Sequence, residues 1–136
     1  MGSPLLDAED ARERLEAWQA DAVRRAADTQ AAGAGLQALR VTAADAHGLV
    51  EVTVDSTGAM AGVRLSARVQ RMSLEQTEQA IMGAYRNARV TLAEAAAEVV
   101  RETVGADSAT GRALLAGFRT ADPEGEAGIE DDEGRY

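Results

Sequence analysis

The chain has 136 residues, of which 46% are hydrophobic and 30 are alanine, so it fits one small domain with a thin core. Its formal net charge is −9, all 14 basic residues are arginine, and it has no cysteine, which excludes disulfides and zinc–thiolate centres. No apolar run approaches the roughly 20 residues that cross a bilayer and no signal-peptide pattern is visible, so we expect a cytoplasmic protein.

A long helix is predicted first, from residue 5 to about residue 38. This stretch is dense in alanine, glutamate, arginine and glutamine, which are strong helix formers. Apolar residues such as Leu15, Trp18 and Leu36 recur on it at intervals of three and four, which marks a weak packing stripe. Gly33 and Gly35 weaken the last turns, so we expect the helix to fray or end near them.

Three segments that alternate between apolar and polar residues follow, at residues 39–45, 49–55 and 59–66. Turn sequences that contain Gly48 and Gly58 separate them. The alternation predicts a three-stranded antiparallel meander with one apolar face and one polar face. On the third strand, Ala61, Val63 and Leu65 are expected to face the core.

A second long helix is predicted from Ser73, which has the form of a capping box with Gln76, to Gly105. Its apolar stripe has a spacing close to 3.5 residues and is predicted to comprise Leu74, Ile81, Tyr85, Ala88, Leu92, Ala95 and Val99. A short helix over residues 108–118 is expected to bury Leu114, Leu115 and Phe118. We therefore expect one α+β domain over residues 5–118 and a disordered acidic tail over residues 119–136, in which residues 120–136 hold seven acids and one arginine.

The lengths of these elements predict an obligate homodimer. Strands of seven residues extend about 23 Å, whereas the second helix extends about 46 Å, so the sheet cannot cover the whole helix. The sheet also has two free edges that can pair with another chain. We expect a second copy to supply the missing cover. The residues expected at the dimer interface are Val52, Val54, Leu74, Ile81, Tyr85 and Leu92.

Two segments of the chain carry a resemblance to a known family. The first is the hairpin, with residues 48–54 (GLVEVTV) followed by Gly58 and a Val63-Arg64-Leu65 triplet. The second is residues 78–88 (EQAIMGAYRNA), an alanine-rich helix. In this combination the chain resembles the YbaB/EbfC family of bacterial nucleoid-associated proteins. The resemblance implies a homodimer with helical arms that binds DNA with little sequence preference. Some members stand beside type VII secretion genes, where they look more like protein-interaction components.

Five arginines are the candidate DNA-binding residues: Arg64, Arg68, Arg71, Arg86 and Arg89. Guanidinium groups bind phosphate in a bidentate manner and tolerate any base sequence. The first three are favoured because no acid lies between Ala59 and Leu74. The alternative is that arginines pair with acids on neighbouring helical turns, as Arg101 could with Glu98 or Arg24 with Asp21 or Asp28.

Other residue types do not indicate chemistry. His47 stands alone in a turn. A single histidine in such a place is more often a solvated side chain than a catalytic base or a metal ligand. Trp18 and Tyr85 fall on apolar stripes and are better explained by packing than by base stacking. Because no catalytic or cofactor-binding motif occurs, we expect a protein that is not an enzyme and needs no metal or cofactor. The alternative to DNA binding is a cytoplasmic protein-interaction adaptor, with a possible role beside type VII secretion.

Overall fold

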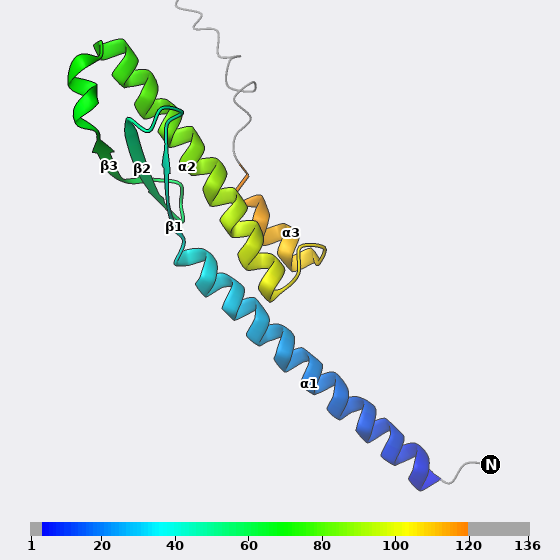
Figure 1. Ribbon diagram of the computed structural model, residues 1–136. Coiled ribbons are helices and arrows are strands. Elements are labelled where there is room, and N and C mark those ends of the chain that lie inside the picture. The colour runs from blue at the N-terminus through cyan, green and yellow to red at the C-terminus, as the bar shows by residue number, and fades with distance from the viewer. Residues whose placement is uncertain (1–3, 120–136) are drawn as a thin grey trace, which may run out of the picture.

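Helix α1, Pro4–Gln37, projects from the molecule as an arm (Figure 1). The computed structural model describes residues 4–119. At 1.5 Å per residue α1 extends about 51 Å, and its buried residues, Ala32 and Leu36, lie in its last two turns. The helix ends at Gln37, close to the predicted end at about residue 38 and two residues after Gly35. Gly35 also allows a close approach of helices, since a Cβ there would lie 2.8 Å from Cγ1 of Val99.

The predicted meander is confirmed. Strands β1 (Arg40–Ala44), β2 (Val50–Asp55) and β3 (Met60–Leu65) form an antiparallel sheet in the order β1-β2-β3. Gly48 and Gly58 have φ angles of 67° and 82°, which the turns require and which side chains disfavour. The register is irregular between Thr53 and Val54, where the pairing shifts by one residue.

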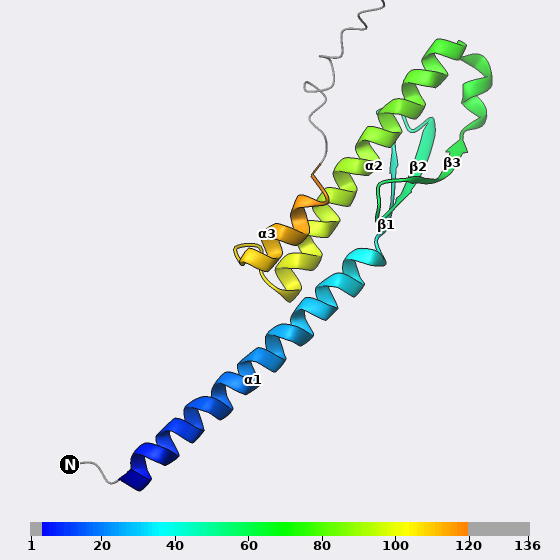
Figure 2. The same ribbon diagram turned by 180° about the vertical axis from the view of Figure 1, so that it is seen from behind.

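Helix α2, Leu74–Thr103, lies across β1 and β2 (Figure 2). The predicted capping box is present, with the Ser73 side chain and that of Gln76 each accepting from the other's backbone N–H. The face of α2 that packs inward differs from the predicted stripe. Ala88 and Leu92 are buried as expected, but Leu74 is 90% exposed. The buried stripe is Ala80, Ala84, Ala88, Leu92, Ala96 and Val100.

The alanine row has a physical reason. Val50, Val52 and Val54 of β2 are fully buried beneath α2, and the small side chains above them allow the helix to lie close to the sheet. Close packing of methyl groups on branched valine side chains compensates for the small apolar area of each alanine. Larger residues on α2, such as Ile81 and Tyr85, lie at the edge of this contact and are partly buried.

The C-terminal half of α2 is covered by the same chain. A second cluster joins Leu36 of α1 with Ala96 and Val100 of α2, and Leu114, Leu115 and Phe118 pack against it. The last three residues belong to α3 (Ala109–Ala116) and the residues after it, and α3 lies beside α2 in both views (Figure 1, Figure 2). This half of α2 therefore needs no second copy for cover, but Leu74, Met82 and Val90 of α2 are still 90%, 47% and 48% exposed, and the homodimer stays a prediction. The arm of α1 is one element that the same chain leaves uncovered.

Strand β3 is the second exposed apolar element. Its Val63 and Leu65 lie opposite Val52 and Val50, so they share the face that α2 covers on the neighbouring strand. They are nevertheless 45% and 49% exposed, because α2 lies over β1 and β2. The expectation that Ala61, Val63 and Leu65 are buried in the core was wrong.

A short 3₁₀ helix, η1 (Ala67–Arg71), connects β3 to α2. The Ser66 hydroxyl caps it by accepting from the backbone N–H of Arg68. The alternation of residues 59–66 does not extend into this segment, and no element was predicted there. Residues 120–136, which make up nearly all of the predicted acidic tail, lie outside the described part of the chain.

Candidate nucleic-acid interface

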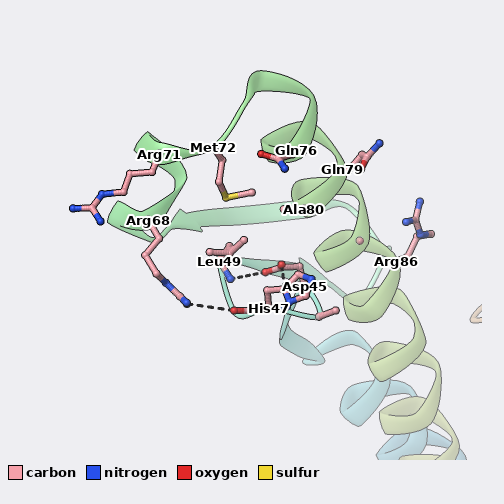
Figure 3. Close-up of a pocket in the computed structure, with 12 residues that line it drawn as sticks. Asp45, His47, Leu49, Arg68, Arg71, Met72, Gln76, Gln79, Ala80 and Arg86 are labelled. Carbon is pink, nitrogen blue, oxygen red and sulfur yellow. Dashed lines mark hydrogen bonds between the residues drawn. The ribbon is translucent and has the colours of Figure 1, made fainter.

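A hollow of about 740 Å³ opens at the end of the sheet where the β1–β2 turn, η1 and the start of α2 meet (Figure 3). Three of the five candidate arginines, Arg68, Arg71 and Arg86, line it. The other lining residues are Asp45, Ala46, His47, Leu49, Met72, Gln76, Gln79, Ala80 and Gly83. The hollow is therefore a concave, arginine-rich site built from three segments that are separate in sequence.

Asp45 fixes the shape of the turn beneath the hollow. Its Oδ1 accepts from the backbone N–H groups of Leu49 at 2.7 Å and Val50 at 2.8 Å, and its Oδ2 accepts from that of His47 at 3.2 Å. Burial by itself raises the pKa of Asp45, but these N–H donors outweigh it, and the pKa lies below its ordinary value. The carboxylate is thus ionised, and its lone pairs are directed to the turn.

The three arginines of the hollow differ in how they are held. Nη2 of Arg68 donates to the carbonyl oxygens of His47 and Gly48 at 3.3 and 3.4 Å, which ties η1 to the β1–β2 turn. Arg71 extends from η1, whereas Arg86 extends from α2 on the other side of the hollow (Figure 3). Neither has an ion pair or hydrogen-bond partner among residues 4–119, so their guanidinium donors are available.

The remaining two candidate arginines lie elsewhere. Arg64 pairs in register with Glu51 on the polar face of the sheet, opposite to α2. Arg89 is partly buried and lies 5.9 Å from the ring centroid of Tyr85, a cation–π contact near the β2–β3 turn. The structure therefore brings together three of the five arginines and separates Arg64 and Arg89 from them.

Two of the expected helix ion pairs can be compared with the structure. Arg101 pairs with Glu98 as expected, whereas Asp21 pairs with Arg25 and not with Arg24. On a helix, residues three and four positions after Asp21 are both within reach of its carboxylate. The structure pairs Asp21 with the arginine four positions on. Both pairs are exposed and contribute little to stability.

A family model with the description YbaB/EbfC DNA-binding family matches residues 7–107 of the chain. The match covers α1 from residue 7 onwards, the whole sheet, η1 and all of α2. The chain belongs to the YbaB/EbfC DNA-binding family. No curated protein matches it. Membership makes the arginine-rich hollow the first place to look for contacts with DNA, because three of the five candidate arginines line it.

Not all of the residues expected at a dimer interface of this YbaB/EbfC protein are accessible to a partner. Val52, Val54 and Leu92 are 0%, 0% and 5% exposed, and the protomer's own helices and strands cover them. Ile81 and Tyr85 are partly buried, and the Tyr85 hydroxyl donates to the carbonyl oxygen of Gly58 at 3.0 Å. Leu74, on the first turn of α2, is exposed.

Several lining residues of the hollow could not be identified from the sequence of this family member. Met72, Gln76, Gln79 and Leu49 carry no functional pattern, and the hollow exists only because η1 folds back towards the β1–β2 turn. Within the described residues no cluster of three or more histidines or acids could hold a metal ion. No helix among those residues is long and apolar enough to span a membrane.

Proposed function

We propose that this protein is a homodimeric nucleoid-associated protein of the cytoplasm that binds DNA through phosphate contacts, with little sequence preference. The observation that carries the proposal is the arrangement of Arg68, Arg71 and Arg86 around one hollow. Arginine binds phosphate oxygens in a planar, bidentate geometry that does not depend on the base. The only acid lining the hollow, Asp45, is occupied by backbone donors.

The proposed dimer is supported by the two apolar surfaces that the protomer leaves uncovered. On β3, Met60, Val63 and Leu65 are 44%, 45% and 49% exposed, and the outer edge of this strand pairs with no other described strand. Tyr85 lies on the side of α2 that faces the β2–β3 turn, because its hydroxyl donates to the carbonyl oxygen of Gly58 there, and Ile81 stands one helical turn before it. A second copy on this surface would cover these side chains and pair the strand edge.

A dimer also doubles the basic surface. Three arginines from each protomer would give about six phosphate contacts. Since each contact releases counterions, the DNA affinity is expected to fall roughly 10³-fold between 50 and 200 mM salt. The single domain proposed for residues 5–118 contains all of these arginines, and the acidic residues after 119 would oppose them.

Gel shifts with random-sequence duplex DNA at the two salt concentrations test the proposal. The test variant carries Arg68→Gln and Arg71→Gln, and the matched control carries Arg101→Gln and Arg112→Gln at the far end of the molecule. The test variant is expected to lose most of its affinity and to show a shallower salt dependence, while the control binds nearly as the parent chain does. No shift by the parent protein at 50 mM salt, with or without residues 120–136, would remove the proposal.

A protein-interaction adaptor is the second candidate, and the arm favours it. Leu15, Trp18 and Val23 on α1 are 53%, 65% and 70% exposed, although aromatic and aliphatic side chains of this size are usually covered. A helix with such residues can enter an apolar groove of a partner. Pull-down after nuclease treatment distinguishes the two functions, because a partner held through DNA is lost and a direct partner of the arm remains.

A further inference from the structure

The uncovered part of α1 carries one continuous apolar stripe. Intervals of three and four residues join Ala8, Ala11, Leu15, Trp18 and Ala22 on one side of the helix, and we call these five residues the arm stripe. At its centre, Leu15 and Trp18 are 53% and 65% exposed. In both views this length of α1 stands clear of the sheet and of α3 (Figure 1, Figure 2). Among residues 4–119, no other element covers the arm stripe.

The same side of α1 is already a helix-packing surface at its C-terminal end. Ala32 and Leu36 continue the spacing of the arm stripe, and both are buried. Leu36 packs with Ala96 and Val100 of α2, while the arm extends past the end of α2 (Figure 1). One side of one helix therefore packs on a helix over its last turns and has the same pattern, uncovered, over the rest.

The residues of the arm stripe suit a second helix better than a sheet or a loop. The alanines at 8, 11 and 22 allow two helix axes to approach closely. Leu15 and Trp18 are large enough to fill the middle of such a contact. A second copy of α1 offers the same order of small, large and small side chains, so the pattern is complementary to itself when one helix is reversed.

Charge and shape favour a reversed second arm over a parallel one. Arg25 stands on the same side of α1, three residues after Ala22. In a parallel pair, Arg25 would face the partner's Arg25, and two like charges would meet in the contact. In an antiparallel pair, Arg25 faces the partner's Ala8. An antiparallel pair also places the two folded bodies at opposite ends of the arms, where they do not compete for space.

One antiparallel register uses the whole uncovered length. If Leu15 lies opposite the partner's Trp18, residues 4–29 of the two arms run alongside each other in opposite directions. This overlap is about 39 Å long at 1.5 Å per residue. It ends just before Ala32, where burial of α1 by its own chain begins. The length that needs cover is thus the length that the second arm supplies.

Charged residues beside the arm stripe are compatible with this register. Arg14 lies opposite the partner's Asp21, and the two-fold symmetry repeats the pair. Asp21 pairs with Arg25 of its own chain, but that pair is exposed, and a second arginine can join it. Asp7 and the partner's Asp28 face each other near the ends of the overlap. Arg25, three residues before Asp28 on the same helix, offsets their repulsion.

We propose that the uncovered arm of α1 pairs with the arm of a second copy in an antiparallel two-stranded coiled coil, centred between Leu15 and Trp18. Because most of the arm stripe is alanine, the contact buries little apolar area, and pairing is expected at protein concentrations on the order of 100 µM. The arm is separate from the β3 surface, so paired arms join two of the proposed dimers. One assembly then contacts two DNA duplexes. This last consequence depends on the proposed function, whereas the pairing of the arms does not.

Disulfide crosslinking tests the pairing and its direction. The chain has no cysteine, so an introduced cysteine is the only one in each variant. Full chains with Ala11→Cys are mixed in equal amounts with tagged full chains with Ala22→Cys and oxidised with glutathione disulfide. The proposed register brings these two positions together, so mixed dimers are expected to exceed the share given by random pairing. A random share, or an excess of dimers of one variant with itself, overturns the proposal.

Sedimentation at about 10 and about 200 µM assigns the association to the arm stripe. Leu15→Glu with Trp18→Glu is expected to abolish the growth in size between the two concentrations. The matched control, Val23→Glu with Gln30→Glu, adds the same charge to exposed positions of α1 outside the arm stripe and is expected to associate as the parent does. Parent-like association of the arm-stripe variant, with circular dichroism showing an unchanged helix content, overturns the proposal.

A charge exchange tests the register. Arg14→Asp and Asp21→Arg are each expected to weaken the association, and the two changes together are expected to restore it, because the opposite charges face each other again. A double variant that associates no better than either single variant overturns the register. If the parent does not self-associate, and a different protein binds the parent but not the arm-stripe variant, the occupant is that protein and the proposal is overturned.

The DNA gel shift distinguishes this proposal from the proposed function. A chain that forms the mixed crosslink but shifts no DNA supports arm pairing and removes the proposed function. A chain that shifts DNA but crosslinks at random keeps the proposed function and overturns arm pairing.

Discussion

Asp45 provides the sharpest test of how the β1–β2 turn is built. Its side chain is 9% exposed and accepts the backbone N–H groups of His47, Leu49 and Val50. Replacement by alanine removes all three acceptor contacts and leaves the N–H of Val50 buried without that partner. Since this turn also carries the carbonyl oxygens that hold Arg68, the same change loosens η1.

The size of the effect follows from the three contacts. A typical intramolecular hydrogen bond contributes about 1 kcal/mol, and those to a charged group contribute about 1.5–3 kcal/mol. We use about 1 kcal/mol for each hydrogen bond, because two of the three donors are only partly buried. For three hydrogen bonds, Asp45→Ala is expected to reduce the free energy of unfolding by about 3 kcal/mol. Asp45→Asn is expected to cost less, since its one carbonyl oxygen can still accept from Leu49 and Val50.

Urea unfolding at fixed protein concentration measures these changes, because a dimer's stability depends on concentration. The slope of the transition should stay constant while the midpoint falls. Asp10→Ala, on the exposed arm, is the matched control and should leave the midpoint unchanged. If Asp45→Ala lowers the free energy of unfolding by less than about 1 kcal/mol, the three hydrogen bonds do not stabilise the turn.

The pH dependence has a definite sign. The pKa of Asp45 in the folded chain lies below the ordinary value of 3.8, so near and below that value the unfolded chain binds protons that the folded chain does not. The stabilising contribution is therefore complete above about pH 5 and is lost as the pH falls through the folded pKa. The stability difference between the parent protein and Asp45→Ala should shrink over that acidic range.

Three further changes test other parts of the molecule. Gly111→Ala should lower the unfolding midpoint strongly, because the new Cβ would lie 2.1 Å from the carbonyl oxygen of Gly105; a midpoint equal to the parent's would contradict the described start of α3. Val63→Asp should shift sedimentation from a dimer towards a monomer of 14.2 kDa with little change in circular dichroism, and an unchanged dimer would exclude the β3 surface. Deletion of residues 120–136, which removes a net charge of −6, should tighten DNA binding in gel shifts at 50 mM salt, and weaker binding would argue against the opposing role of these acids.

Local patterns in the sequence were sufficient for the element order. The alternation of apolar and polar residues in β1, β2 and β3 and the capping box at Ser73 each depend on neighbours within a few residues. For such features, the spacing of the apolar residues and the capping or turn residues at the ends of each element determine which secondary structure forms. The three strands, the helix starts and the glycine turns were therefore predictable without knowledge of the packing.

The packing faces were less predictable. The stripe expected on α2 gave weight to large residues such as Ile81 and Tyr85 and missed the buried alanines at 80, 84 and 96. Hydrophobicity patterns score side-chain size, but the distance between a helix and a sheet decides whether small or large residues fit beneath it. The same reason explains Gly35, which was expected only to weaken the last turns of the helix and also allows a close approach to Val99.

By itself, the sequence determined the α+β element order, the turns and the resemblance to a DNA-binding family, because these depend on contacts between residues that are near in the chain. Only the tertiary structure decided that the C-terminal half of α2 is covered by its own chain, that β3 and the arm are left open, and that Arg68, Arg71 and Arg86 line one hollow. Those outcomes depend on contacts between residues far apart in the chain, such as those of Arg68 with His47 and Gly48, some 20 positions away.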